Sequence, residues 1–180
     1  FGAAAALAGD IAVIGAPGAG EQIGAAYVFR RGANGAWTQV QRLTPVGADG
    51  RALYGSAVAV VGNTVFVGAP GLQQGAGAVY VYRAGPDGRF ASAGRLSSTG
   101  TVAGSAFGAQ LVAAGDELLA GAPMSNGQTG AVHRYAADAT TGEWREQARY
   151  LPFDAARQSG FGAAIAVSGS ELWIGAPRAA

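Results

Sequence analysis

The chain has 180 residues, enough to bury a sizeable core, with 49% hydrophobic residues, 31 glycines and only 13% charged residues. A net charge of +1, with acids and bases interspersed, gives no electrostatic case for binding nucleic acid or an anionic membrane. The lack of cysteine excludes disulfides, thiolate metal sites and a cysteine nucleophile, and without an uninterrupted run of about 18 apolar residues we expect no membrane insertion.

Two short motifs recur along the chain at one period. An aromatic residue followed by glycine stands at Phe1-Gly2, Tyr54-Gly55, Phe107-Gly108 and Phe161-Gly162, at spacings of 53, 53 and 54 residues. Gly-Ala-Pro triplets begin at Gly15, Gly68, Gly121 and Gly175, with the same spacing. Because a fixed period of this length marks a stacked or radial architecture, we divide the chain into repeats of residues 1–53, 54–106, 107–160 and 161–180.

Each complete repeat contains four strand-like runs bounded by turn residues. The first two runs form a hairpin, and its central glycine followed by a small polar residue is typical of a type II′ turn. These turns are Gly9-Asp10, Gly62-Asn63, Gly115-Asp116 and Gly169-Ser170. The third strand is predicted at 25–30, 78–83 and 131–135, and the fourth at 37–43, 90–96 and 144–150. Glycine, proline and β-branched residues interrupt every helical period, so we expect no helices.

Four strands per repeat predict the blade of a β-propeller, in which small antiparallel sheets pack face to face around an axis. We therefore predict an all-β fold with three complete four-stranded blades and the first hairpin of a fourth. Small side chains on one face of the first strand, such as Ala4 and Ala6, suit the crowded centre of a propeller. Such an arc cannot close a ring, so we expect the remainder of its own chain or neighbouring chains to cover its apolar ends.

The aromatic-glycine and Gly-Ala-Pro motifs, separated by a hairpin, resemble the FG-GAP repeats of integrin α-subunit propellers and of many bacterial surface proteins. The resemblance covers the whole chain and implies a ring of about seven blades. It also implies adhesion or partner binding without catalysis, in a secreted, cell-surface or periplasmic protein.

The chain departs from this family at the loop between the first two strands. Many members carry an Asp-x-Asp-x-Asp-Gly-like calcium loop there, whereas each turn here offers one polar side chain: Asp10, Asn63, Asp116 or Ser170. Calcium takes six to eight oxygen ligands. We therefore expect no cofactor, calcium included, and interpret these residues as turn formers.

Few side chains could support catalysis. His133, the single histidine, occupies the position of Tyr27 and Tyr80 in the other repeats, which favours a packed ring over a catalytic base. No Gly-x-Ser-x-Gly motif accompanies it. The acidic residues fall in different loops and strand ends without a shared motif: Glu21, Asp49, Glu117 and Glu143. We therefore predict that the segment is not an enzyme.

At two further positions of the repeat, large side chains could have either a binding role or a structural role. The arginines at one position could form a basic stripe, but covering apolar surface and guarding a strand edge is favoured: Arg42, Arg95 and Arg149. The aromatic residues at the other could stack on sugars, but blade core is favoured: Trp37, Phe90 and Trp144.

The candidate binding residues lie on the connections between strands two and three and between successive blades, which emerge on one face. Binding residues tend to lie on loops held by a rigid scaffold. The first kind of connection contains Glu21, Gln22, Gln73, Gln74, Ser125, Asn126 and Gln128, and the second contains Asp49, Arg51, Asp154, Arg157 and Gln158. We predict that this face binds a protein or glycan ligand; the alternative is an accessory or structural domain of a larger enzyme or extracellular assembly.

Overall fold

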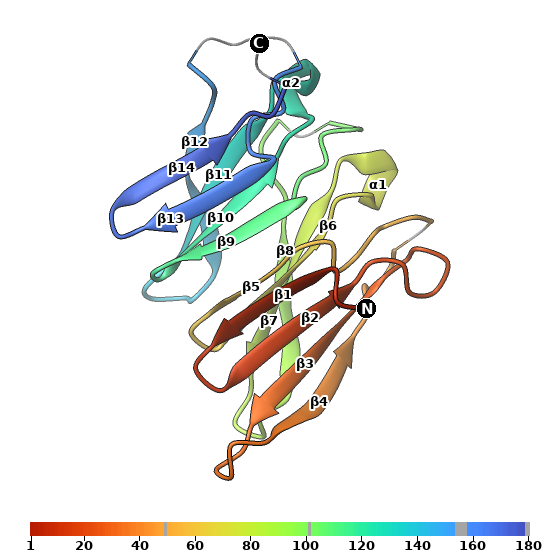
Figure 1. Ribbon diagram of the computed structural model, residues 1–180, viewed down its shortest axis with the longest axis vertical. Helices are drawn as coiled ribbons and strands as arrows, with labels where there is room; N and C mark the ends of the chain where they lie inside the picture. Colours follow the sequence, from red (N-terminus) through yellow and green to blue (C-terminus); the bar gives the residue numbers. More distant parts are fainter. Residues whose placement is uncertain (49, 101, 154–157, 179–180) are drawn as a thin grey trace.

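The computed structural model describes residues 1–48, 50–100, 102–153 and 158–178. These residues form four separate antiparallel sheets, three with four strands and one with two (Figure 1). In each sheet the strands pair in chain order. The predicted all-β fold, with three complete blades and the first hairpin of a fourth, is confirmed.

The strands follow the repeat closely. The first blade has β1 (Ala4–Ala8), β2 (Ile11–Ala16), β3 (Ala25–Arg31) and β4 (Trp37–Leu43). The second has β5 (Val58–Val61), β6 (Thr64–Ala69), β7 (Ala78–Ala84) and β8 (Phe90–Leu96). The third has β9 (Gln110–Ala114), β10 (Glu117–Ala122), β11 (Ala131–Ala137) and β12 (Trp144–Tyr150). The last repeat contributes β13 (Ala164–Ser168) and β14 (Glu171–Gly175).

The hairpin turns have the predicted form. Ala8 pairs with Ile11, which leaves Gly9-Asp10 as a two-residue turn, and Gly9 has a φ of 57°. Asp10 does not share this positive φ, which distinguishes a type II′ turn from type I′. The equivalent glycines Gly62, Gly115 and Gly169 have φ values of 53°, 60° and 58°.

The expectation that no helices occur is wrong at two single turns, α1 (Leu72–Gly75) and α2 (Ser125–Gln128). Neither is an ordinary right-handed helix, because Gln73 has φ 51° and ψ 57°, and Asn126 has φ 52° and ψ 45°. Both turns lie between the second and third strands of a blade. Their left-handed backbone belongs to the candidate site described below.

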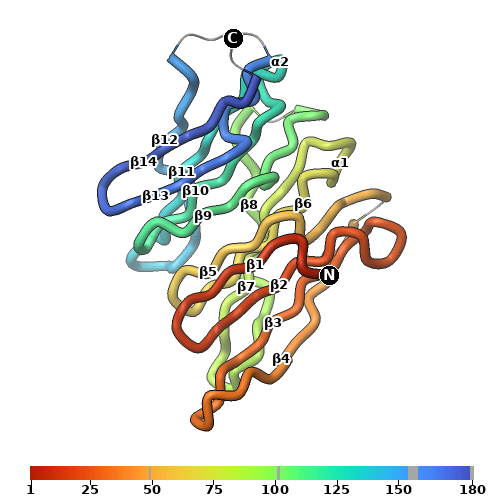
Figure 2. The backbone as a smooth tube through the Cα atoms, viewed as in Figure 1, coloured from red at the N-terminus to blue at the C-terminus, as the bar shows by residue number. Residues whose placement is uncertain are grey.

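The apolar core lies between the blades, whose first strands run next to one another (Figure 2). One cluster joins Val13 of the first blade to Val65 of the second, and another joins Phe66 of the second blade to Leu118 of the third. Neighbouring residues of β6 thus face opposite blades, as the alternation of side chains along a strand requires. Each blade is a layer with two buried faces wherever it has two neighbours.

The motif glycines meet at every blade junction. A β-carbon on Gly15 would lie well under 3.0 Å from the carbonyl oxygen of Gly55, the glycine that follows the next blade's aromatic residue. Gly68 and Gly108 repeat this approach, as do Gly121 and Gly162. The neighbour is backbone and cannot rotate away, so even one methyl group would push the blades apart.

The aromatic residue of each motif packs on the third strand of its own blade. Tyr54 meets Tyr80 edge to face at 5.2 Å between ring centroids, and its hydroxyl donates to the Tyr82 hydroxyl at 2.9 Å. Phe107 meets His133 in the same way at 5.4 Å. These edge contacts suit the opposite polarity of ring faces and ring edges, and they anchor the start of each blade.

We predict that Gly68→Ala lowers the free energy of unfolding by about 3 kcal/mol or more, because the methyl group overpacks the junction with Gly108. Gly18→Ala is the control, since a β-carbon there meets nothing within 4 Å. Urea unfolding followed by circular dichroism measures both variants. Equal midpoints would show that the blades shift to accept the methyl group.

Candidate functional site

The connections between second and third strands and those between blades share one side of the molecule, opposite the two-residue hairpin turns (Figure 1). We call this side the loop face. Among the described residues it comprises 17–24, 44–48, 50–53, 70–77, 97–100, 102–106, 123–130, 151–153 and 158–160.

A left-handed turn recurs in the loop face of all three complete blades. In the first blade Gly20, Glu21 and Gln22 have φ values of 56°, 55° and 71°. The other two turns are Gln73, Gln74 and Gly75 at 51°, 57° and 80°, and Asn126, Gly127 and Gln128 at 52°, 69° and 70°. Left-handed backbone costs a non-glycine residue roughly 1 kcal/mol or more. Six of these nine positions nevertheless carry a polar side chain.

Each left-handed turn is hydrogen-bonded to the start of the following blade. The Leu53 N–H donates to the Gln22 carbonyl at 3.0 Å, and the Tyr54 N–H donates to the Ile23 carbonyl at 3.0 Å. The same pair of bonds links Ala106 to Gly75, Phe107 to Ala76, Gly160 to Gln128 and Phe161 to Thr129. The backbone of the turn is therefore fixed, while most of its polar side chains are exposed; Asn126 Oδ1 accepts a hydrogen bond from Arg149 at 2.8 Å.

The predicted binding residues differ in backbone conformation and in exposure. Seven of them have positive φ, and all of these are exposed except half-buried Gln22: Glu21, Gln22, Gln73, Gln74, Asn126, Gln128 and Gln158. Ser125 instead is buried, and its hydroxyl donates to the Ala122 carbonyl at 2.9 Å, so it supports the turn. Asp49, Asp154 and Arg157 lie outside the described residues.

Arg51 and Gln74 come together at a hollow of about 430 Å³ in the loop face. Gly50, Gly71 and Gly75 complete its lining. Gly71 approaches the Arg51 carbonyl so closely that a β-carbon on it would clash. A guanidinium and a primary amide beside bare backbone can donate and accept hydrogen bonds, which suits the recognition of a polar ligand.

The polar residues of the hairpin turns form turns and contacts within their own blade. Asp10 accepts a hydrogen bond from Arg30 at 2.8 Å, a contact within the first blade. Within the described residues, no three histidine, cysteine or acidic side chains gather closely enough to hold a metal ion. No helix among those residues is long and apolar enough to cross a membrane.

One polar cluster was missed by the sequence analysis. His133 Nδ1 lies 3.0 Å from Glu146 Oε1, and Ser98 Oγ lies 3.0 Å from the same nitrogen and 3.1 Å from Nε2. His133 is only 1% exposed, which confirms the prediction of a packed ring. Serine, histidine and carboxylate are the groups of a hydrolase triad. Here, however, the serine lies near both ring nitrogens, on the same side as the carboxylate contact to Nδ1, and the ring is buried among packed side chains.

The fold and the loop face together define a propeller-type repeat protein. Residues 37–82 match the family described as FG-GAP repeat. The match runs from the fourth strand of the first blade to the third strand of the second, and it includes Tyr54-Gly55 and the triplet at Gly68. The sheets are those of β-propeller blades, and residues 37–82 are similar to an FG-GAP repeat, as the resemblance of the motifs predicts.

Solved structures agree on the fold. A protein from Lactobacillus plantarum is 18% identical with a TM-score of 0.61, over 92% of this chain and 47% of that one. Sqt1 from Saccharomyces cerevisiae is 11% identical with a TM-score of 0.54, over 83% of this chain and 35% of that one. The chain thus spans less than half the length of either protein. Among curated proteins, no sequence matches it.

We predict that the protein loses stability as the pH falls below about 6.5, the ordinary pKa of histidine. Burial lowers the pKa of His133, although the Glu146 carboxylate opposes this shift. The unfolded chain therefore binds a proton at a higher pH than the folded chain does, so acidification favours unfolding until the folded-state pKa is passed.

Urea midpoints measured between pH 8 and pH 5 check this prediction. His133→Gln keeps a hydrogen-bonding side chain of similar size but does not titrate, so its midpoint is expected to change less over this range. A wild-type slope equal to that of the variant would assign the pH dependence to other groups.

Proposed function

We propose that this chain is a non-catalytic interaction segment that binds a protein or glycan ligand through its loop face. The observation that carries the proposal is the set of polar side chains kept on left-handed backbone at equivalent positions of three blades. Glycine would relieve the strain at each of these positions. Backbone strain that persists at exposed, polar positions is a recognised mark of functional sites.

The surrounding structure supports display of these side chains to a ligand. The loop-face turns share one backbone form, because the same hydrogen bonds to the next blade hold each of them. Their side chains differ, from Glu21 and Gln22 to Asn126 and Gln128. A rigid backbone with varied side chains lowers the entropy that a binding loop loses on association.

Adhesion, at a cell surface or in a secreted or periplasmic protein, is the role that we propose for this binding. It rests on the FG-GAP repeats and on the motifs shared with integrin-type propellers. The net charge of +1 favours neither nucleic acid nor an anionic membrane as the partner.

Replacing Gln73 and Gln74 by glycine tests the loop face directly. We expect Gln73→Gly/Gln74→Gly to raise the free energy of unfolding by about 1 kcal/mol, because left-handed strain is relieved. Binding is expected to fall, because two displayed amides are lost. The measurements are urea unfolding together with binding to a glycan array and cross-linking to neighbouring proteins in the native setting.

Asn63→Ser is the matched control, since Asn63 lies in a hairpin turn on the opposite side and serine occupies that position in the last repeat. Its binding is expected to equal that of the wild type. If the double variant is more stable yet binds every ligand of the wild type equally well, the loop face is not the binding surface.

The second candidate is an accessory or structural domain of a larger enzyme or extracellular assembly, and it is supported by the small share of the similar solved chains that this segment covers, 47% and 35%. In that case catalysis would belong to residues elsewhere in the polypeptide. Enzyme assays that respond to the loop-face variants, without any ligand bound by the segment alone, would favour this alternative.

A further inference from the structure

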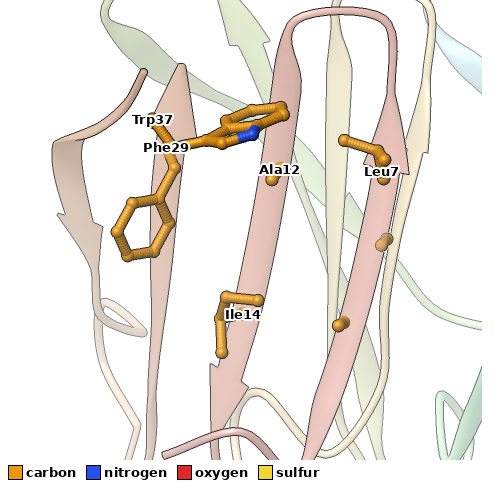
Figure 3. Close-up of a pocket in the computed structure, with 7 residues that line it drawn as sticks. Leu7, Ala12, Ile14, Phe29 and Trp37 are labelled. Atoms are coloured by element: carbon orange, nitrogen blue, oxygen red, sulfur yellow. The ribbon is translucent and has the colours of Figure 1, made fainter. Parts of the chain in front are cut away.

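Exposed apolar side chains occur on two kinds of surface in this molecule. The first is the flat face of a blade that has no neighbour, where Leu7, Phe29 and Trp37 lie on adjacent strands (Figure 3). In the second blade the counterparts of these residues are buried: Val60, Tyr82 and Phe90. A face of this kind is what another blade covers, so it indicates no separate ligand.

The second surface is the loop face, whose exposed apolar side chains lie outside the sheets. Val46 is 86% exposed, Val102 is 65% exposed and Met124 is 45% exposed. Ile23 and Phe153 are exposed as well. The described turns on the opposite side of the molecule carry no large apolar side chain that is exposed in this way. Because covering apolar groups removes them from water, their concentration on one side marks an interaction surface.

The hollow that Arg51 and Gln74 line adjoins these side chains. Val46 belongs to the same connection between blades as Arg51. Val102 belongs to the next connection, whose Gly104 N–H donates to the Gln74 carbonyl at 3.1 Å. At about 430 Å³ the hollow has the size of a small ligand pocket and can take a side chain of a partner. A polar hollow thus has exposed apolar side chains on both connections that adjoin it.

The guanidinium of Arg51 is the cationic group of this hollow. Other arginines are paired with acids of the chain: Arg30 with Asp10 at 2.8 Å, and Arg145 with Glu143 at 3.1 Å. Within the part of the chain that the structure describes, no carboxylate forms an ion pair with exposed Arg51. Because the planar N–H fork of a guanidinium matches the two oxygens of a carboxylate, the hollow is complementary to an acidic group.

The surroundings of the hollow favour a protein over a glycan as the source of this carboxylate. Sugar rings pack their C–H faces on flat aromatic side chains, and the lining of the hollow contains none: Gly50, Arg51, Gly71, Gln74 and Gly75. Arginine together with apolar side chains is instead the composition that protein interfaces favour. The exposed valines on the adjoining connections provide the apolar part.

We propose that the hollow binds an aspartate or glutamate side chain of a protein partner, whose apolar residues cover Val46 and Val102. The carboxylate accepts hydrogen bonds from the Arg51 guanidinium and the Gln74 amide. Glycine at three of the five lining positions leaves room for the incoming side chain. This inference rests on the proposed function and deepens it, because it names the chemistry of the ligand.

The test selects short random peptides, displayed on phage, against the native-length protein. We expect the selected peptides to carry aspartate or glutamate beside apolar residues. Each peptide is then synthesised in two forms, with its acidic residue and with asparagine or glutamine in its place, and fluorescence anisotropy measures the affinity of both. Neutralising the acid is expected to weaken binding roughly tenfold or more, because a charge-assisted hydrogen bond is lost.

Protein variants locate the site that holds the acid. Arg51→Gln is expected to weaken binding of the acidic peptide roughly tenfold or more and to abolish its advantage over the neutral form. Arg51→Lys keeps the charge without the planar fork, so an intermediate affinity is expected. Arg89→Gln is the matched control, since it removes the same charge from an exposed turn on the opposite side, and it should bind like the wild type.

Three results would overturn the inference. They are a selection that yields no acidic peptide while glycans bind, equal affinity for the acidic and neutral peptides, and equal affinity of the Arg51→Gln and Arg89→Gln variants for the acidic peptide. Each of these results leaves the proposed function standing. The proposed function fails separately if neither peptides nor glycans respond to Gln73→Gly/Gln74→Gly.

Discussion

At each blade junction the glycine of a Gly-Ala-Pro triplet touches the backbone of the glycine that follows the next blade's aromatic residue. This contact sets how closely neighbouring sheets approach at their inner strands. Close approach in turn requires small side chains there, and Ala57 and Ala59 meet the third blade in this way. The aromatic residue next to the glycine then falls under the third strand, where Tyr54 and Phe107 are fully buried. Both motifs thus follow from one backbone contact.

The same junction fixes the loop face. The residues that donate to the left-handed turns, such as Leu53 and Tyr54, immediately precede the glycine of the junction. A blade that is held at its glycine therefore also holds the turn of the blade before it. The hydrogen bonds that join each turn to the next blade involve only backbone atoms, so they place no requirement on the side chains of the turn. In these short segments the backbone atoms join the blades, whereas the side chains are available for the binding that we propose.

The sequence was sufficient to predict the blades, because glycine, proline and hairpin-turn residues mark the boundaries of each strand. It was also sufficient to predict that His133 is packed, since tyrosine fills the equivalent positions. It could not reveal the left-handed turns, because Glu21 or Gln73 carries no local preference for that backbone and tertiary hydrogen bonds impose it. The Ser98–His133–Glu146 cluster escaped for a related reason: its members come from a loop and two strands, and no fixed spacing connects them.

Burying the apolar face of a blade and holding its left-handed turn require different parts of the neighbouring blade. The left-handed turn of the third blade is anchored by Gly160 and Phe161, which stand at the boundary with the last repeat. The hydrogen bonds to each turn thus come from residues just before the inner hairpin of the next blade. Burying an apolar face takes all four strands, because Phe90 is covered by the fourth strand of its neighbour through Gln41. Substitutions on the outer strands should thus affect stability more than recognition, whereas substitutions in the turns should do the reverse.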